Sequence, residues 1–135
     1  MFMRNITLFL FWWFLFFSIP TSSADNEINL DIDENGEYDA LSDGLLIIRY
    51  LFGLTGDDLV SGILGSNSLV VEPIEIKSKL DSMRANLDVD GNGSVDALTD
   101  GLLILRYLFG LRGDSLVTQV IGTGAARNSS ESIED

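Results

Sequence analysis

The hydrophobic residues of this chain include two short runs that are almost identical and lie 57 positions apart. The first reads Leu-Leu-Ile-Ile-Arg-Tyr-Leu-Phe at residues 45–52, and the second reads Leu-Leu-Ile-Leu-Arg-Tyr-Leu-Phe at residues 102–109. A glycine follows each run, where a residue with a left-handed backbone commonly ends a helix. The pattern predicts a helix over residues 40–52 and a matching helix in the second copy. Because apolar residues occupy nearly every side of both predicted helices, we expect each helix to be buried on more than one side.

Weaker patterns predict shorter elements between and after these helices. Residues 57–64 begin with a suitable N-cap aspartate and predict a short helix. Residues 73–85 begin with a proline, which suits a first helical turn, and keep a loosely helical spacing into the second copy. The pattern of the first short helix returns at residues 113–122. The final residues, 123–135, predict a flexible end or the start of a truncated unit.

A polar loop rich in carboxylates comes directly before each predicted long helix. The loops read Asp-Ile-Asp-Glu-Asn-Gly-Glu-Tyr-Asp at residues 31–39 and Asp-Val-Asp-Gly-Asn-Gly-Ser-Val-Asp at residues 88–96. Calcium binds about six to eight hard oxygen ligands, and a short loop can supply them from alternate positions around a sharply turning glycine. Two copies at a fixed offset favour calcium over an ordinary acidic turn, and the many protein oxygens favour calcium over magnesium. We therefore predict two Ca²⁺ sites, the first formed by Asp31, Asp33, Asn35, Glu37 (through its carbonyl), Asp39 and Asp43, and the second by Asp88, Asp90, Asn92, Ser94 (through its carbonyl), Asp96 and Asp100.

The last ligand of each loop departs from the usual pattern. The usual loop ends with a carboxylate at its twelfth position, where this chain has Ser42 and Thr99. The next residues, Asp43 and Asp100, are carboxylates, and we expect them to close the loops from the first helical turn. Ser42 and Thr99 would then be helix caps or outer ligands, although closure by these two residues is an alternative. A second alternative is that the two aspartates only favour the dipole at the helix N-terminus.

The composition restricts the site chemistry to oxygen ligands. The chain has no cysteine and no histidine, so zinc and other softer metals lack their usual ligands and no disulfide can form. Small domains without disulfides often depend on a bound metal. The 21 acidic and 8 basic residues give a net charge of −13. This balance argues against nucleic acid or an anionic membrane as a partner.

Residues 1–24 have the pattern of a secretory signal peptide. One basic residue, Arg4, precedes an apolar run at residues 6–19, and small residues follow up to Ala24. The apolar run is shorter than the roughly 20 residues that a membrane-spanning helix needs. An uncleaved N-terminal anchor is the alternative. We expect a secreted, extracellular protein with no membrane association after signal cleavage.

The two units resemble the duplicated calcium-binding repeats of dockerin domains, which are non-catalytic modules of secreted polysaccharide-degrading enzymes and cellulosome components. The likeness lies in the acidic loop without an obligatory entering helix, and in Ile-Ile-Arg-Tyr-Leu at residues 47–51, matched by Ile-Leu-Arg-Tyr-Leu at residues 104–108. It covers about two-thirds of the chain after residue 24. The resemblance implies an EF-hand-like fold, calcium-dependent folding and a cohesin-type partner. It also places partner selection at Leu41-Ser42 and Leu98-Thr99.

These features together predict an all-α fold, with two EF-hand-like calcium loop–helix repeats packed as a small pseudo-twofold helical domain. The predicted organisation has five parts. They are the signal peptide at residues 1–24, the first repeat at 25–65, the linker and connecting helix at 66–86, the second repeat at 87–122 and the flexible or truncated tail at 123–135.

The predicted function is a non-catalytic module that folds on calcium and docks a cohesin-like or other extracellular protein, in keeping with a role in polysaccharide degradation. The alternative is a free-standing calcium-stabilised structural or calcium-buffering protein with no docking partner. A docking module should expose an apolar or Ser/Thr-rich patch near the loop–helix junctions, whereas a buffer need not. Catalysis by paired carboxylates is disfavoured, because a chain of this size has no room for a substrate cleft and each loop already assigns its carboxylates to metal. We expect Arg49 and Arg106 to neutralise nearby loop acids, with contact to a partner as the alternative.

Overall fold

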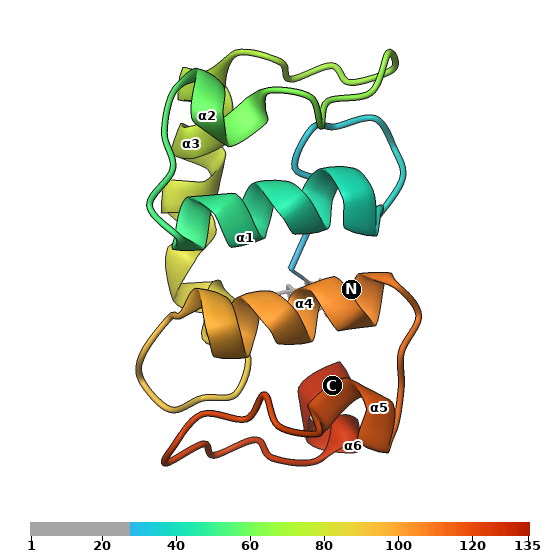
Figure 1. Ribbon diagram of the computed structural model, residues 1–135, viewed down its shortest axis with the longest axis vertical. Coiled ribbons are helices and arrows are strands. Elements are labelled where there is room, and N and C mark those ends of the chain that lie inside the picture. Colours follow the sequence, from blue (N-terminus) through green and yellow to red (C-terminus); the bar gives the residue numbers. More distant parts are fainter. Residues whose placement is uncertain (1–27) are drawn as a thin grey trace, which may run out of the picture.

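The computed structural model describes residues 28–135, and every regular element in this range is helical (Figure 1). The all-α prediction is therefore confirmed for the described part of the chain. The predicted signal peptide lies outside the described residues. No helix within residues 28–135 combines the length and the apolar character needed to cross a membrane. The helices are α1 (Leu45–Leu51), α2 (Asp57–Val60), α3 (Pro73–Met83), α4 (Leu102–Leu108), α5 (Asp114–Val117) and α6 (Ser130–Glu134), with π-helical turns η1 (Ala40–Gly44) and η3 (Ala97–Gly101) and the 3₁₀ turn η2 (Arg84–Leu87).

Two similar units lie one above the other around a central pair of helices. α1 and α4 run side by side and antiparallel at the centre of the molecule (Figure 1). α2 packs against α1, and α5 packs against α4. α3 contacts both α1 and α2 and then leads through η2 into the second unit, while α6 contacts α5. This arrangement places each acidic loop at the beginning of one central helix.

Each central helix begins with a π-helical turn. Gly44 N donates to Asp39 O over 3.1 Å, and Gly101 N donates to Asp96 O over 3.0 Å. These bonds reach back five residues instead of the four of an α-helix, so each turn holds one extra residue. The sequence predicts a helix from residue 40, and the structure has a wider first turn followed by a regular α-helix.

α2 and α3 end earlier than predicted. α2 ends at Val60, because the next residue, Ser61, leaves the helical conformation with a ψ of 124°. α3 ends at Met83, and η2 carries the chain from there into the second loop.

Close contact between α1 and α4 depends on one glycine in each unit. A Cβ atom on Gly44 would lie 2.7 Å from Leu105 Cδ1, and a Cβ atom on Gly101 would lie 3.2 Å from Ile48 Cγ1. Both glycines have ordinary helical backbone angles. The close packing of the two helices therefore requires glycine at these positions, and the backbone conformation does not. We call the contact between α1 and α4 the seam.

Arg49 attaches α2 to α1, and Arg106 attaches α5 to α4. Arg49 Nη1 donates to the carbonyls of Asp58, Leu59 and Ser61 over 2.9–3.3 Å, and Arg106 makes the three corresponding bonds to the end of α5. The prediction that these arginines neutralise loop acids is wrong. The last carbonyls of a helix have no partner within it and carry partial negative charge, so they bind the guanidinium instead.

The hydrophobic core is larger in the first unit than in the second. α3 closes the first cluster, and the second cluster lies between α4 and α5. The first cluster consists of Ile32, Leu46, Ile47, Tyr50, Leu59, Ile76, Leu80, Leu87 and Ile104, and the second of Leu103, Leu116 and Val120.

Replacing Gly44 or Gly101 with leucine should force α1 and α4 apart. Overpacking of a tight contact costs about 1–3 kcal/mol, which urea unfolding would measure. Gly65→Leu is the matched control, because the nearest atom to a Cβ there is Ser68 Oγ at 3.9 Å. It should change stability by less than about 0.5 kcal/mol. Equal losses at all three positions would contradict a close seam.

Candidate metal centre

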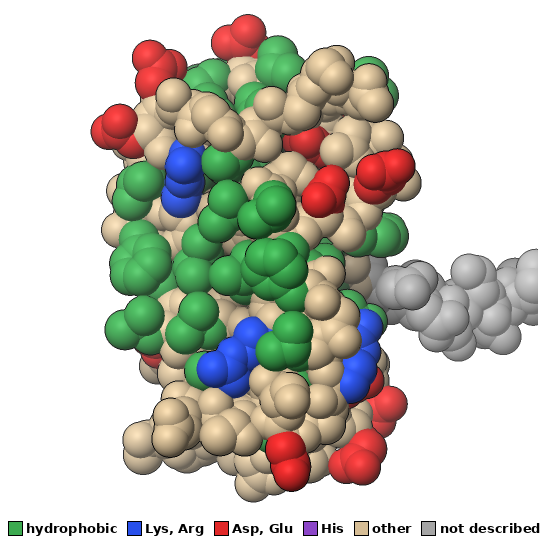
Figure 2. Space-filling view, turned by 45° about the vertical axis from the view of Figure 1, so that its right-hand side comes forward, with side chains coloured by type: hydrophobic (Ala, Val, Ile, Leu, Met, Phe, Trp, Pro, Cys, Tyr) green, Lys and Arg blue, Asp and Glu red, His purple; other side chains and the backbone are tan. Residues whose placement is uncertain are grey.

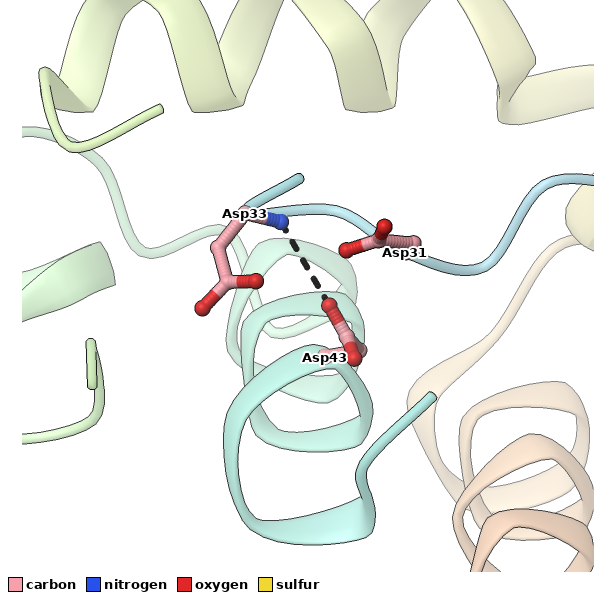
Figure 3. Close-up of side chains that lie close together, drawn as sticks. All are labelled: Asp31, Asp33 and Asp43. Atoms are coloured by element: carbon pink, nitrogen blue, oxygen red, sulfur yellow. Dashed lines mark hydrogen bonds between the residues drawn. The ribbon is translucent and has the colours of Figure 1, made fainter. Parts of the chain in front are cut away.

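In each unit, three carboxylates come together where the acidic loop meets the central helix, α1 or α4. In the first unit, Asp31, Asp33 and Asp43 each offer an oxygen, and these oxygens all lie within 4.8 Å of one another (Figure 3). We call this group the first triad. The second triad consists of Asp88, Asp90 and Asp100, which meet the same distance. In each triad the second and third members are fully buried.

Asp43 points back from η1 into the loop. Its Oδ1 accepts the N–H of Ile32 at 2.6 Å and that of Asp33 at 3.4 Å, and its Oδ2 accepts the N–H of Asp39 at 2.9 Å. Figure 3 draws the bond from Asp33. Asp100 accepts the corresponding three N–H bonds in the second unit. All three donors precede the helix, so this carboxylate ties the loop to the helix.

Asp31 and Asp33 fold the loop backbone around the triad. The two oxygens of Asp31 accept the N–H groups of Asn35 and Gly36, both at 3.0 Å, and Asp33 Oδ1 accepts the N–H of Asn35 at 3.2 Å. Gly36 has a φ of +87°, which glycine adopts without strain. The second loop repeats the three bonds and has Gly93 at φ +85°.

The remaining predicted ligands lie beside the triads. Asn35 Oδ1 accepts the N–H of Glu37 at 2.7 Å, and the Glu37 side chain is exposed. Asp39 comes directly before η1, and its carbonyl accepts the N–H of Gly44. The second unit places their counterparts in the same roles, namely Asn92, Ser94 and Asp96.

Ser42 and Thr99 occupy different environments. Ser42 is buried, and within residues 28–135 its Oγ has no hydrogen-bond partner. Thr99 Oγ1 donates to Asp100 Oδ2 at 3.3 Å. In both units it is the next residue, Asp43 or Asp100, that joins the triad.

Two residues outside the loop support the first triad, and sequence reasoning missed both. Ser68 Oγ donates to Asp33 Oδ2 at 2.5 Å. Lys79, on α3, donates from Nζ to the backbone carbonyl of Asp31 at 2.5 Å. The sequence signal for Lys79 is weak: it is one of 8 basic residues in a chain with 21 acidic ones, so it could have been expected to lie near a carboxylate loop.

The second triad has different support from a different part of the chain. Gly122 N donates to Asp90 Oδ2 at 2.7 Å. The guanidinium of Arg127 donates to the backbone carbonyls of Asp88 and Val89. Arg127 therefore serves the position that Lys79 serves in the first unit. The repeat offset cannot reveal this pairing, because the two basic residues are not 57 positions apart.

Burial raises the pKa of the Asp43 and Asp100 carboxyls above the ordinary value of 3.8. The backbone N–H bonds lower the pKa and the neighbouring Asp33 or Asp90 raises it, but desolvation is the largest cause. A carboxylate has about four lone-pair positions. Backbone N–H donors occupy three of them on each aspartate, and Thr99 Oγ1 takes a fourth on Asp100. A cation placed against the remaining position on Asp43, or in place of the Thr99 hydroxyl on Asp100, would offset both the desolvation and the repulsion between carboxylates.

Comparison with protein-family models, with curated proteins and with solved structures finds no match for this chain. The site is therefore interpreted from its own geometry. The two triads are groups of oxygen ligands that could hold a metal ion, and the identity of the metal follows from chemical argument alone.

Metal-free protein should lose stability as the pH rises. The raised pKa of Asp43 and Asp100 means that the folded state binds protons more tightly than the unfolded state. Their stabilising contribution is complete below about pH 3.8 and is lost as the pH rises through the folded-state pKa. Urea unfolding in a chelator, at pH values rising from about 3.8, would measure the decline.

The Asp43→Asn plus Asp100→Asn variant is the control for this pH dependence. Neither side chain titrates in that variant, so its decline over the same range should be smaller. A metal-free stability that increases with pH in the original protein would contradict the prediction.

Proposed function

We propose that this chain is a calcium-stabilised docking module, and the observation that carries the proposal is the pair of buried triads. Each places three carboxylates within 4.8 Å of one another, with two of them fully buried. Burying unpaired negative charge is strongly unfavourable. A hard divalent cation between the carboxylates would neutralise them, and its binding free energy would become folding free energy.

The π-helical turns support Asp43 and Asp100 as the closing ligands. The usual calcium loop ends with a carboxylate at its twelfth position, which in the first loop is Ser42. Because η1 holds one extra residue in its first turn, the thirteenth residue, Asp43, takes the place that the twelfth has on a regular helix. The same reasoning applies to Thr99 and Asp100 with η3. The wider turn thus supplies a physical reason for the displaced carboxylate.

Calcium suits this set of donors better than magnesium. Each triad is followed in its loop by further oxygen donors, which are Asn35, Glu37 and Asp39 in the first unit. Calcium accepts about six to eight oxygens at flexible geometry, whereas magnesium requires near-octahedral geometry and retains several waters. A loop that can offer so many protein oxygens favours the larger ion.

The first experiment is far-UV circular dichroism of residues 25–135, which include all the described residues, in chelator and then with added calcium. Helix content should rise and saturate at two calcium ions per chain by calorimetry, because each unit holds one triad. Asp31→Ala plus Asp88→Ala should abolish the response. Asp57→Ala plus Asp114→Ala, at exposed acids outside the triads, is the control and should retain it. An equal response to magnesium, or none to either ion, would refute calcium binding.

Docking is supported by exposed apolar side chains along the seam. Leu41 and Leu98 are 63% and 62% exposed, and Phe52 and Phe109 are 57% and 53% exposed. η1, which carries Leu41, contacts α4, and η3, which carries Leu98, contacts α1. We call these four residues the seam face. Figure 2 shows hydrophobic side chains gathered across the middle of the face that it draws, at the level of the central helices. Exposed apolar patches of this kind are typical of protein-binding sites.

The seam face favours a docking module over a calcium buffer. Leu41 and Leu98 belong to the loop–helix junctions at which the dockerin resemblance places partner selection. We therefore propose a secreted module that binds a cohesin-like or other extracellular protein partner, as in polysaccharide degradation. A free-standing calcium-stabilised structural or buffering protein is the second candidate, and it gives no reason for the exposed seam face.

A panel of cohesin domains from secreted polysaccharide-degrading systems would test docking by calorimetry in calcium. Leu41→Asp plus Leu98→Asp should weaken binding by about tenfold or more, with the calcium response retained. Leu69→Asp plus Ile74→Asp is the matched control, because these side chains are 77% and 78% exposed and lie just before α3 and on α3, outside the two central helices. Failure of every cohesin domain to bind would favour the free-standing protein.

A further inference from the structure

Both acidic loops contain the dipeptide Asn-Gly, at Asn35-Gly36 and at Asn92-Gly93. An asparagine loses its side-chain amide most readily before a glycine, because glycine has no side chain to hinder an attack by its own backbone nitrogen. No other asparagine of the sequence precedes a glycine. The two asparagines most prone to this reaction therefore stand among the predicted metal ligands.

The reaction, deamidation, needs no enzyme and no reagent except water. The backbone nitrogen of the glycine attacks Cγ of the asparagine and forms a C–N bond. The bond from Cγ to Nδ2 breaks, and ammonia leaves with the hydrogen of the glycine N–H. Water then opens the resulting succinimide ring at either of its carbonyls. One opening gives aspartate, and the other gives isoaspartate, whose backbone runs through Cγ and is longer by a methylene group.

The folded first loop engages the very atoms that this reaction removes. Gly36 N donates to Asp31 Oδ2 at 3.0 Å, and Asn35 Nδ2 donates to Asp33 Oδ2 at 3.4 Å. Asn35 Oδ1 also accepts the N–H of Glu37 at 2.7 Å. Deamidation takes the hydrogen from Gly36 N and expels Nδ2, so it must break the bonds to both aspartates. The ordered loop therefore opposes the reaction.

The second loop makes the same bonds and has a further contact from outside the loop. Gly93 N donates to Asp88 Oδ2 at 2.9 Å, and Asn92 Nδ2 donates to Asp90 Oδ2 at 3.4 Å. A Cβ atom on Gly122 would overlap Asn92 Nδ2. The backbone at Gly122 therefore lies directly against this side-chain amide and restricts its movement.

We propose that Asn35 and Asn92 are modification sites, at which deamidation makes the loss of a bound metal ion irreversible. A metal ion that holds the carboxylates of a loop in place stabilises the ordered loop and keeps its hydrogen bonds formed. After the ion leaves and the loop opens, deamidation proceeds. Isoaspartate then displaces every later ligand along the backbone, so the loop cannot bind the ion again. This inference rests on the proposed function, because calcium is the ion expected to order the loops.

Peptide mass spectrometry of the chain from residue 25 tests the proposal at neutral pH in calcium, in chelator, and in chelator with urea. Deamidation of Asn35 and Asn92 should be slower in calcium than in either other solution by at least about tenfold, because the loops must open first. A peptide with the sequence of residues 88–96 is the control. It contains Asn92 without the rest of the fold, so its rate should be the same in calcium and in chelator.

The same samples test whether the modification disables the chain. Calcium is restored after incubation in chelator, and the rise in helix content is measured by circular dichroism. This rise should fall in proportion to the isoaspartate formed at Asn35 and Asn92. A full rise in a chain that carries isoaspartate at both positions would overturn the proposal.

A matched pair of variants tests the contact over Asn92. Gly122→Ala should displace the side-chain amide and speed deamidation of Asn92 in calcium by at least about threefold, while Asn35 in the same chain keeps its original rate. Gly65→Ala, 57 positions earlier, is the control and should change neither rate, because the nearest atom to a Cβ there is Ser68 Oγ at 3.9 Å. Circular dichroism verifies that both variants fold. An unchanged rate at Asn92 in Gly122→Ala would contradict protection by the folded loop.

The remaining outcomes separate this inference from the proposed function. A chain that gains helix with calcium but deamidates equally fast in calcium and in chelator overturns the inference and leaves the proposed function intact. A chain whose helix content ignores calcium defeats the proposed function. Slower deamidation in chelator alone than in chelator with urea would then still support protection by the folded loops, and equal rates would overturn it.

Discussion

The burial of one carboxylate at the beginning of each central helix is the constraint on which the rest of this structure depends. Asp43 and Asp100 are removed from water, held by three backbone N–H groups each, and placed against two more carboxylates. The N–H bonds favour the charged form, and desolvation and repulsion oppose it. A bound cation would resolve this conflict, and the three carboxylates of each triad lie close enough together to hold one.

The same short segment also joins the two units. Gly44 follows Asp43 directly, Gly101 follows Asp100, and both glycines form the seam. A shift of either aspartate relative to its loop therefore moves the backbone that packs against the opposite helix. Because protein interiors are tightly packed, such a shift is transmitted to the neighbouring helix instead of being absorbed. Displacing either aspartate would consequently disturb the seam as well as its own triad.

The sequence predicts the repeated features of this fold and misses the features that differ between the repeats. Two apolar runs, two acidic loops and the terminating glycines are local patterns, and they correctly predict the central helices and the residues that gather in the triads. The π-helical turns could not be predicted, because one extra residue in a single turn leaves the hydrophobic spacing of the helix unchanged. The targets of Arg49 and Arg106 were missed because partners nine to twelve residues away depend on how α2 and α5 pack. Lys79 and Arg127 were missed because each reaches its carbonyl from a distant and non-equivalent segment.

The difference between the two units gives the second triad a dependence that the first lacks. The first loop is supported by Lys79 on an 11-residue helix that is anchored by buried Ile76 and Leu80. The second loop is supported by Arg127, which lies on no helix. Val89 stands between two carboxylates of the second triad and is only half-buried, whereas its counterpart Ile32 is fully buried. Since anything that binds only the ordered form stabilises that form, a metal ion would contribute more to the order of the second loop than to that of the first, which its own chain already supports.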